Sequence, residues 1–337
     1  MFLSHWIDYL ARGRPQYLIV HITSRCNYRC SHCFVPPPAA DIGAKHFVSL
    51  ARQAGRLFWL DIGGGEPFLR DDLAEIVPAF SARVIQIPTN ASMPEKTVST
   101  LREIKSRTTA SLCVSLSLDG LRETHDRIRG REGSWDAVWD TYERIRGLGG
   151  VAVKINTVLR GDNYTELRDL MKEVKGHAPD FHSVILLRGT PRDPSCALPP
   201  PDELARIIPE ILKGCAGYTY GRNPLSAYLL RNYHRHLWDV SSRILREKRQ
   251  VIPCLAGRAH LVVMADGSVS SCELLPAIGD ITTHSLSDIL ALPAFRIQIA
   301  SIRAKKCFCT HNCALLASVF FNPLSVARLF APRRWGE

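Results

Sequence analysis

Three cysteines in a short run constrain this chain more than any other feature. Cys26, Cys30 and Cys33 have the spacing C-x-x-x-C-x-x-C, directly after an apolar, β-branched stretch over residues 17–23. Three thiolates can bind three irons of a [4Fe–4S] cluster and leave the fourth iron open to a substrate or cosubstrate. We therefore expect the cysteines on the loop that leaves a first strand. A structural zinc site is the alternative interpretation, because zinc is often bound by three or four cysteines.

A glycine-rich segment follows the next apolar run. Residues 57–62 are apolar apart from one aspartate, and residues 63–67 read Gly-Gly-Gly-Glu-Pro. Glycines let the backbone approach a ligand closely, and the carboxylate of Glu66 can accept hydrogen bonds from an ammonium group. Such a segment alone is typical of a turn. At this distance after a cysteine triplet, it indicates a ligand site.

Together these motifs resemble those of the radical S-adenosylmethionine (SAM) superfamily. In that family the glycine-rich segment receives the SAM amino group. Three more segments resemble its strand ends: residues 84–90, with Ala91 where glycine is usual, residues 115–135, with their S-L-D-G block, and residues 153–158. The resemblance covers roughly residues 16–313. It implies cofactor-binding roles for Gly64, Gly65, Glu66, Thr89, Asn90, Ser117, Asp119 and Asn156.

The order of the elements predicts an α/β fold. Apolar runs that end near residues 23, 63, 89, 119, 157 and 187 alternate with helical patterns, which is typical of a parallel sheet with crossover helices. The resemblance implies a partial (β/α)6 TIM-like barrel, in which ligands collect at the C-terminal strand ends. We expect an N-terminal helical segment over residues 1–15, the barrel over 16–190, a Pro-rich linker with helices over 191–250, and a cluster-binding extension with the C-terminal tail over 251–337.

A second set of cysteines lies near the C-terminus. Asp266-Gly267-Ser268 separates two apolar runs and predicts a hairpin turn. The set resembles a SPASM or twitch domain, with one auxiliary [4Fe–4S] cluster, because five cysteines are too few for two clusters. The resemblance implies Cys254, Cys272 and Cys313 as ligands, with Cys309 preferred over Cys307 for the fourth. The C-x-C-x3-C run is shorter than the family's, and zinc is again the alternative.

Further polar residues have weaker signals. Cys196, in the Pro-rich stretch near the expected mouth of the barrel, is either a hydrogen-atom donor to a substrate radical or an inert loop cysteine. Cys113 lies in an apolar strand and is expected to be a buried small hydrophobe. His32 and His311 are expected to orient their loops through hydrogen bonds rather than to bind metal.

Composition limits the cellular setting. Eleven cysteines with clustered spacing and an N-terminus without a signal sequence indicate metal binding in a reducing compartment, so we expect a cytoplasmic protein. The chain has no uninterrupted apolar run of about 18 residues. The formal net charge of +11 favours an anionic partner. Nucleic acid is disfavoured, because no RNA-binding module is present, and the apolar and then basic tail leaves peripheral membrane contact open.

The resemblance implies reductive cleavage of SAM to a 5′-deoxyadenosyl radical that abstracts hydrogen from a substrate carbon, with an electron donor such as flavodoxin or ferredoxin. The auxiliary cluster would aid oxidation or bond formation. We expect a peptide or protein substrate, together with a separate leader-peptide-binding protein. Oxidation or epimerisation of a small metabolite (a sugar, aminocyclitol or lipid) is the alternative. A non-catalytic metal-binding or electron-transfer protein is the third interpretation.

Overall fold

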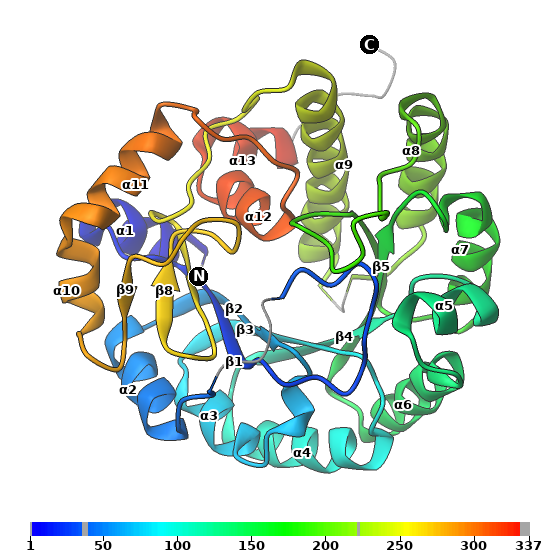
Figure 1. Ribbon diagram of the computed structural model, residues 1–337, viewed down its shortest axis with the longest axis horizontal. Coiled ribbons are helices and arrows are strands. Elements are labelled where there is room, and N and C mark those ends of the chain that lie inside the picture. Colours follow the sequence, from blue (N-terminus) through cyan, green and yellow to red (C-terminus); the bar gives the residue numbers. More distant parts are fainter. Residues whose placement is uncertain (1, 36–39, 221–222, 331–337) are drawn as a thin grey trace.

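A mixed sheet of nine strands organises the computed structural model, which describes residues 2–35, 40–220 and 223–330. The strand order is β6-β5-β4-β3-β2-β1-β7-β8-β9, and β1 to β6 are all parallel. The six parallel strands are β1 (Tyr17–Thr23), β2 (Leu57–Gly64), β3 (Ala82–Thr89), β4 (Ser111–Ser117), β5 (Ala152–Leu159) and β6 (Phe181–Leu186). Since β6 does not pair with β1, the predicted partial barrel is confirmed as an open one (Figure 1).

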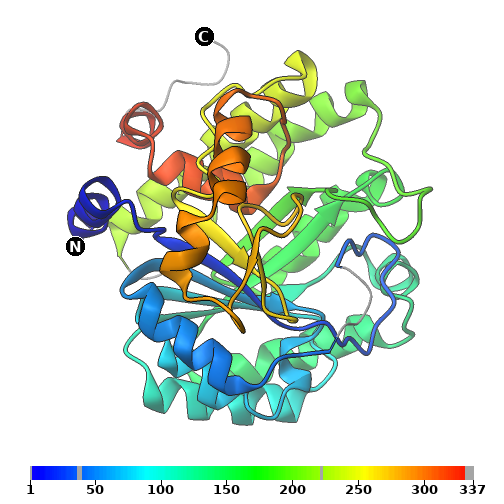
Figure 2. The same cartoon turned by 60° about the vertical axis from the view of Figure 1, so that its left-hand side comes forward.

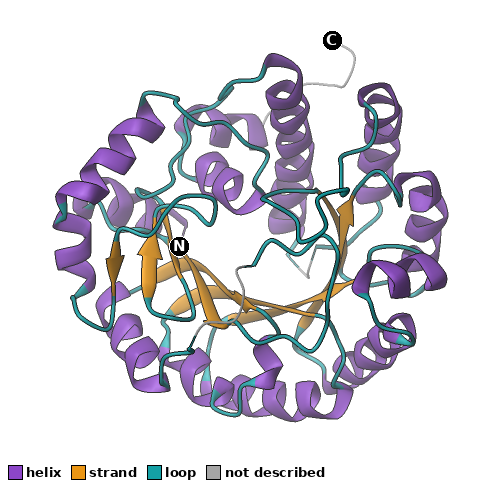
Figure 3. Ribbon diagram, viewed as in Figure 1, coloured by secondary structure: helices purple, strands orange, loops and turns teal. Residues whose placement is uncertain are grey.

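Crossover helices surround the outside of this sheet (Figure 3). They are α2 (Ala44–Ala54), α3 (Leu73–Ala79), α4 (Pro94–Arg107), α5 (Arg122–Arg129), α6 (Ser134–Leu148), α7 (Leu167–Gly176) and α8 (Pro201–Cys215), with short 3-10 turns at Pro67–Leu69 and Tyr164–Glu166. The sequence analysis missed α5. Its eight residues are almost all charged or polar, so they show no apolar periodicity.

The alternation of side chains along β1 divides the core into two parts. Leu18, Val20 and Ile22 are buried in the cluster between the sheet and the outer helices. Tyr17 and Ile19 belong to a second cluster inside the barrel. Successive side chains of a strand point to opposite faces of the sheet, so the odd-numbered positions of β1 face the barrel lumen. A strand buried on both faces carries the continuous apolar run seen in the sequence.

The C-terminal cysteine region continues the barrel sheet. The strand β7 (His260–Val263) pairs in parallel with β1, while β8 (Ser268–Ser270) and β9 (Gly279–Asp280) follow antiparallel. This confirms the predicted hairpin. Two short helices that the sequence analysis did not predict, α10 (Leu286–Ala291) and α11 (Pro293–Arg303), then lie beside β9 and lead back toward α12 (Figure 2).

The remaining helices close the open side of the barrel. Helices α9 (Pro224–Glu247), α12 (Asn312–Phe320) and α13 (Pro323–Phe330) complete the ring between α8 and α11 (Figure 1). Helix α1 (Phe2–Arg12) packs against β2. The indole of Trp6 donates to the carbonyl of Phe320 at 2.9 Å, and Asn232 Nδ2 donates to the carbonyl of Leu329 at 2.7 Å. Much of the apolar tail up to residue 330 is therefore packed against the protein, although Leu324 and Phe330 are 78% and 55% exposed. Residues 331–335 lie outside the described residues.

Within the described ranges, no individual helix combines enough length and apolarity to cross a bilayer. The pair α12 and α13 meets these criteria only when taken together, across a bend of 84°.

Replacing Ile62 by alanine tests the packing between sheet and helices. Ile62 is completely buried in β2, so Ile62→Ala should lower the free energy of unfolding by about 2–5 kcal/mol through lost burial and a cavity. Urea denaturation under anaerobic conditions measures this change. The control Ile297→Ala removes a side chain on α11 that is 69% exposed, and it should change stability by no more than about 0.5 kcal/mol. Equal effects of the two substitutions would contradict this core.

Candidate functional site

The loop that carries the cysteine triplet leaves β1 and packs directly against the glycine-rich end of β2. Gly65 N donates to the carbonyl of Thr23 at 2.8 Å, and Glu66 N donates to that of Arg25 at 2.9 Å. A Cβ on Gly64 would lie 2.1 Å from the carbonyl oxygen of Thr23, and one on Gly65 would lie 2.0 Å from that of Arg25. Gly64 also has a φ of 126°, which favours glycine. Here the two glycines are required for the contact between the two loops.

Glu66 ties three strand ends together. Its Oε1 accepts from Thr89 Oγ1 at 2.7 Å and from Phe68 N at 3.2 Å, and its Oε2 accepts from Asn90 N at 2.7 Å. Burial raises the pKa of Glu66 to about 7, against the lowering effect of these hydrogen bonds. A carboxylate has about four lone-pair sites. The three internal bonds therefore leave one acceptor site on Oε2 for a ligand.

Two side chains contact the sulfurs of the triplet. Asn90 Nδ2 lies 3.8 Å from Cys26 Sγ and donates to Asn27 Oδ1 at 2.9 Å. Arg129 Nη1 lies 3.6 Å from Cys30 Sγ. Polar donors of this kind suit thiolate ligands, because hydrogen bonds to the sulfurs of an iron–sulfur cluster stabilise its charge. The chain thus fits a cluster bound by three cysteines.

Asp119 is the partner of Arg129. Its Oδ2 lies 2.7 Å from Arg129 Nη2, and its Oδ1 accepts from Val158 N at 2.9 Å. Burial tends to raise the pKa of Asp119, but the Arg129 guanidinium holds that pKa below its usual value. The sequence analysis predicted Asp119 as a cofactor ligand and overlooked Arg129. The motif places both residues in order, but nothing in it shows that they form a buried ion pair.

Ser117 and Asn156 are neighbours at the ends of β4 and β5, where they are paired in register. Both side chains are half-buried. Both lie on the same face of their strand as the residues two positions earlier, which is the face toward the lumen. Below them, Lys154 Nζ donates to Gln86 Oε1 at 2.7 Å, and Gln86 Nε2 donates to Asp61 Oδ1 at 3.0 Å. The lumen is therefore polar at this depth.

The Pro-rich loop after β6 covers the cysteine loop. Arg192 N donates to the carbonyl of Cys33 and Asp193 N to that of Ser31, both at 2.9 Å. Cys196 is half-buried in this same loop and donates its backbone N–H to the carbonyl of Asp193 at 3.1 Å. Its role as a hydrogen donor stays a prediction.

Four of the five C-terminal cysteines lie together. Cys254 and Cys307 pack against a small cluster that contains Cys272. Cys309 interacts electrostatically with Cys254 and Cys272. Gln250 stabilises the group, because its amide donates to the carbonyl of Cys307 at 2.8 Å and accepts from Cys254 N at 3.3 Å. Four thiolates fit the ligand set of one [4Fe–4S] cluster.

Cys313 is placed differently from these four cysteines. Its thiol forms a hydrogen bond with the side chain of Tyr17 and packs with the apolar cluster inside the barrel. Its nearest ionisable groups include Glu273, which pairs with His21 and His311. The sequence analysis overlooked Glu273, although this residue directly follows Cys272.

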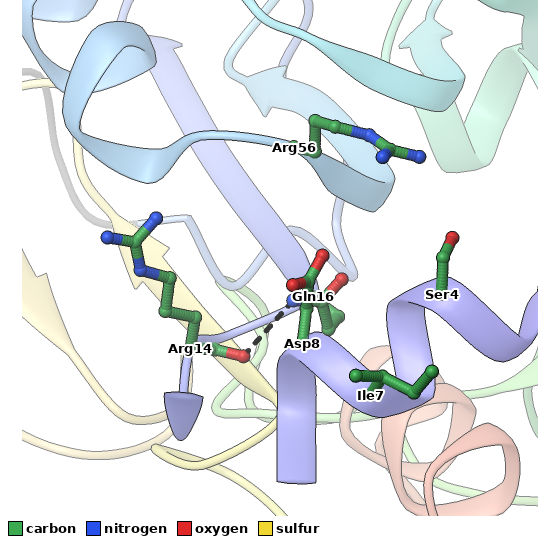
Figure 4. Close-up of a pocket in the computed structure, with 6 residues that line it drawn as sticks. All are labelled: Ser4, Ile7, Asp8, Arg14, Gln16 and Arg56. Atoms are coloured by element: carbon green, nitrogen blue, oxygen red, sulfur yellow. Dashed lines mark hydrogen bonds between the residues drawn. The ribbon is translucent and has the colours of Figure 1, made fainter. Parts of the chain in front are cut away.

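A surface hollow of about 410 Å³ lies at the other end of the sheet. It is lined by Ser4, Ile7, Asp8, Arg14, Gln16 and Arg56 (Figure 4). Gln16 and Arg56 directly precede β1 and β2, so this hollow is at the N-terminal ends of the strands. The cysteine triplet and Glu66 follow the C-terminal ends, so the hollow is separate from the candidate site.

Relatives of known name share parts of this chain. It is 23% identical over 302 residues to the antilisterial bacteriocin subtilosin biosynthesis protein AlbA of Bacillus subtilis, which covers 83% of this chain and 60% of that protein. It is 28% identical over 188 residues to the pre-heme d1 synthase of Dinoroseobacter shibae, covering 50% of this chain and 45% of that one. It is 32% identical over 174 residues to the GTP 3′,8-cyclase of Listeria welshimeri, covering 47% and 50%. The chain spans about half the length of these curated relatives.

Solved structures share its fold. SuiB of Streptococcus suis bound to SAM has a TM-score of 0.65 at 16% identity, covering 87% of this chain and 68% of that one. The enzyme anSMEcpe with bound SAM has a TM-score of 0.64 at 16% identity, covering 94% and 98%.

Family models match both cysteine regions. The radical SAM superfamily model matches residues 20–174, and the model of the iron–sulfur cluster-binding SPASM domain matches residues 254–314. These models imply SAM and [4Fe–4S] clusters as cofactors. The chain therefore contains a radical SAM domain over residues 20–174, followed by an iron–sulfur cluster-binding SPASM domain over residues 254–314.

Proposed function

We propose that this protein modifies a peptide or protein substrate by radical SAM chemistry. The observation that carries the proposal is the extent of the match to AlbA, a bacteriocin biosynthesis protein, which takes in 83% of this chain. The solved structures of similar fold also include SuiB bound to its precursor peptide SuiA and anSMEcpe bound to a peptide.

A small-metabolite substrate is the second candidate. The pre-heme d1 synthase and the GTP 3′,8-cyclase are more identical to this chain than AlbA is, at 28% and 32%. Their matches, however, take in only 50% and 47% of it. A match over part of the chain supports shared cofactor chemistry more than a shared substrate.

When bound, the clusters and SAM supply a 5′-deoxyadenosyl radical able to abstract hydrogen from an unactivated carbon, together with a site that accepts an electron. In the proposal, Cys26, Cys30 and Cys33 hold the first cluster. Glu66 offers its free acceptor site to the SAM amino group, supported by Gly64 and Gly65 at the same turn.

The ends of three further strands orient SAM in this proposal. Thr89 and Asn90 hold Glu66 in place, as their hydrogen bonds show. Ser117 and Asn156, side by side on β4 and β5, offer a hydroxyl and an amide to the polar ribose. In this proposal the barrel keeps water away from the reacting groups, and this prevents side reactions.

Arg129 stabilises negative charge at Cys30 in this proposal. Its guanidinium is held by Asp119, which itself has no exposed surface. A buried cation beside a thiolate lowers the cost of the charge on sulfur and on the attached iron. The Asp119–Arg129 pair thus positions a positive charge beside Cys30.

Partners complete the proposal. An electron donor such as flavodoxin or ferredoxin would reduce the first cluster, and a separate protein would bind the leader segment of the substrate. The basic net charge of +11 favours docking of such acidic electron carriers. Cys196, on the loop that covers the cysteine loop, is retained as a hydrogen donor to the substrate radical.

Changing Glu66 to glutamine tests the SAM amino-group site. The substitution keeps the size of the side chain but replaces one acceptor oxygen by an NH2 group, and hydrogen bonds to charged groups contribute about 1.5–3 kcal/mol. We expect SAM affinity to fall by about tenfold or more, as measured by anaerobic calorimetry, with the iron content unchanged. The control is Glu75→Gln, at an exposed position of α3, which should leave affinity unchanged. Unaltered SAM affinity in Glu66→Gln would contradict this placement.

Changing Asp119 to asparagine tests the buried ion pair. The variant leaves the Arg129 guanidinium buried without a counter-charge. The free energy of unfolding, measured in urea, should therefore fall by about 3–5 kcal/mol. Asp136→Asn is the matched control, because Asp136 and its partner Arg122 are both about half exposed. An exposed pair contributes about 0–1 kcal/mol. Similar losses in both variants would contradict a larger contribution of the buried pair to stability.

A deuterium-transfer assay tests the substrate class. The reconstituted enzyme is supplied with SAM, reductant and an extract of its source cells grown in D2O, and deuterium in 5′-deoxyadenosine is measured by mass spectrometry. Hydrogen abstraction from a peptide predicts transfer that depends on Cys26, Cys30 and Cys33 and that is lost when the extract is pretreated with protease. If transfer persists after protease treatment of the extract, and the filtrate of a small-pore filter still supports it, the small-metabolite proposal replaces the peptide one.

A further inference from the structure

Three potential metal ligands meet beside the auxiliary cysteines. Glu273, His311 and Cys313 each have a ligand atom within 4.8 Å of the others. Glu273 follows β8, and the other two residues belong to the start of α12, where His311 is the N-cap. Two segments far apart in the sequence therefore bring a carboxylate, an imidazole and a thiol to one point.

The site is buried and has a built support. His311 is 0% exposed, and the side chain of Glu273 is 6% exposed. Glu273 Oε2 contacts His311 Nε2, while Glu273 Oε1 lies 2.8 Å from the Nε2 of His21 on β1. Burying a carboxylate without compensation is costly. His21 therefore fixes the carboxylate through one oxygen and leaves the other oxygen directed at His311.

Cys313 is available to this site because four other cysteines already form a complete set. Cys254, Cys272, Cys307 and Cys309 lie together, and four thiolates satisfy one [4Fe–4S] cluster. Cys313 packs instead in the apolar cluster inside the barrel, where its thiol meets the Tyr17 side chain.

The types of the three ligand atoms favour zinc. One sulfur, one nitrogen and one oxygen ligand suit Zn²⁺, which binds cysteine, histidine and carboxylate groups in tetrahedral sites. Ca²⁺ and Mg²⁺ are disfavoured, because they take oxygen ligands. Three protein ligands leave one tetrahedral position open, as in catalytic zinc sites. Tyr17 and His21 belong to the lumen-facing positions of β1, so the site borders the lumen.

We propose that Glu273, His311 and Cys313 bind one zinc ion next to the auxiliary cluster, with the open position available to a water molecule or an anionic group of the substrate. Cys313 binds as the thiolate and loses its proton on metal binding. His21 positions the carboxylate through the hydrogen bond to Oε1, as outer-shell groups do in zinc sites. The inference is independent of the substrate class proposed above.

Paired cysteine variants test the proposal through metal content. The full chain is reconstituted anaerobically with iron and sulfide, given one equivalent of Zn²⁺, freed of loose metal and analysed for zinc, iron and sulfide. We expect the wild type to hold about one zinc and about eight irons. Cys313→Ser should lose the zinc and keep the iron and sulfide. Cys309→Ser should keep the zinc and lose about four irons. Cys113→Ser, in β4 and outside both groups, is the folding control and should keep both metals.

A second variant and a spectroscopic measurement distinguish zinc bound at this site from zinc bound by the cluster cysteines. Glu273→Gln keeps every thiol, so it should reduce zinc binding at least tenfold without loss of iron. Zinc-edge X-ray absorption of the wild type should show one sulfur at about 2.3 Å and nitrogen or oxygen neighbours at about 2.0–2.2 Å. Three or four sulfurs around zinc, a wild type without zinc, or loss of about four irons from Cys313→Ser would each overturn the proposal.

Discussion

The close contact between the backbone after β1 and the glycines at the end of β2 is the constraint on which the site depends. Any side chain at Gly64 or Gly65 would overlap the carbonyl oxygens of Thr23 and Arg25. With the two glycines present, the loop of Cys26 lies beside Glu66, and Glu66 in turn holds Asn90 near the Cys26 sulfur. The positions of the first cysteines and of the proposed SAM contacts are therefore set by one backbone approach.

Much of the fold could be predicted from the sequence because the strands are apolar runs that end in polar motifs. The ends of β1 and β3, at Thr23 and Thr89, lie where the sequence placed them, and the other ends of the parallel strands fall within about two residues. Helix α5 was missed, since its charged residues carry no periodic signal. Arg129 was missed for a related reason, because its importance comes from burial against Asp119 and Cys30.

The spacing of the cysteines could not show in which direction each thiol points. The resemblance implied Cys313 as an auxiliary ligand, but its thiol lies apart from the other four cysteines, at the start of α12. A helix that begins at Asn312 rotates its first side chains toward the barrel, where Tyr17 and Glu273 lie. Spacing restricts which residues can share a metal, and the backbone path then decides which of them do.

The parallel pairing of β7 with β1 also limits how a substrate can enter. Residues 17–20 of β1 pair with residues 260–263 of β7 on one side and with β2 on the other. The two cysteine regions are thus attached to a single strand, and moving one away from the other would break a ladder of backbone hydrogen bonds. The β1–β7 edge of the sheet therefore offers no route to the interior, and a substrate has to approach from the C-terminal strand ends, where the described loops meet. A bulky or folded substrate would have to present an extended segment to this opening.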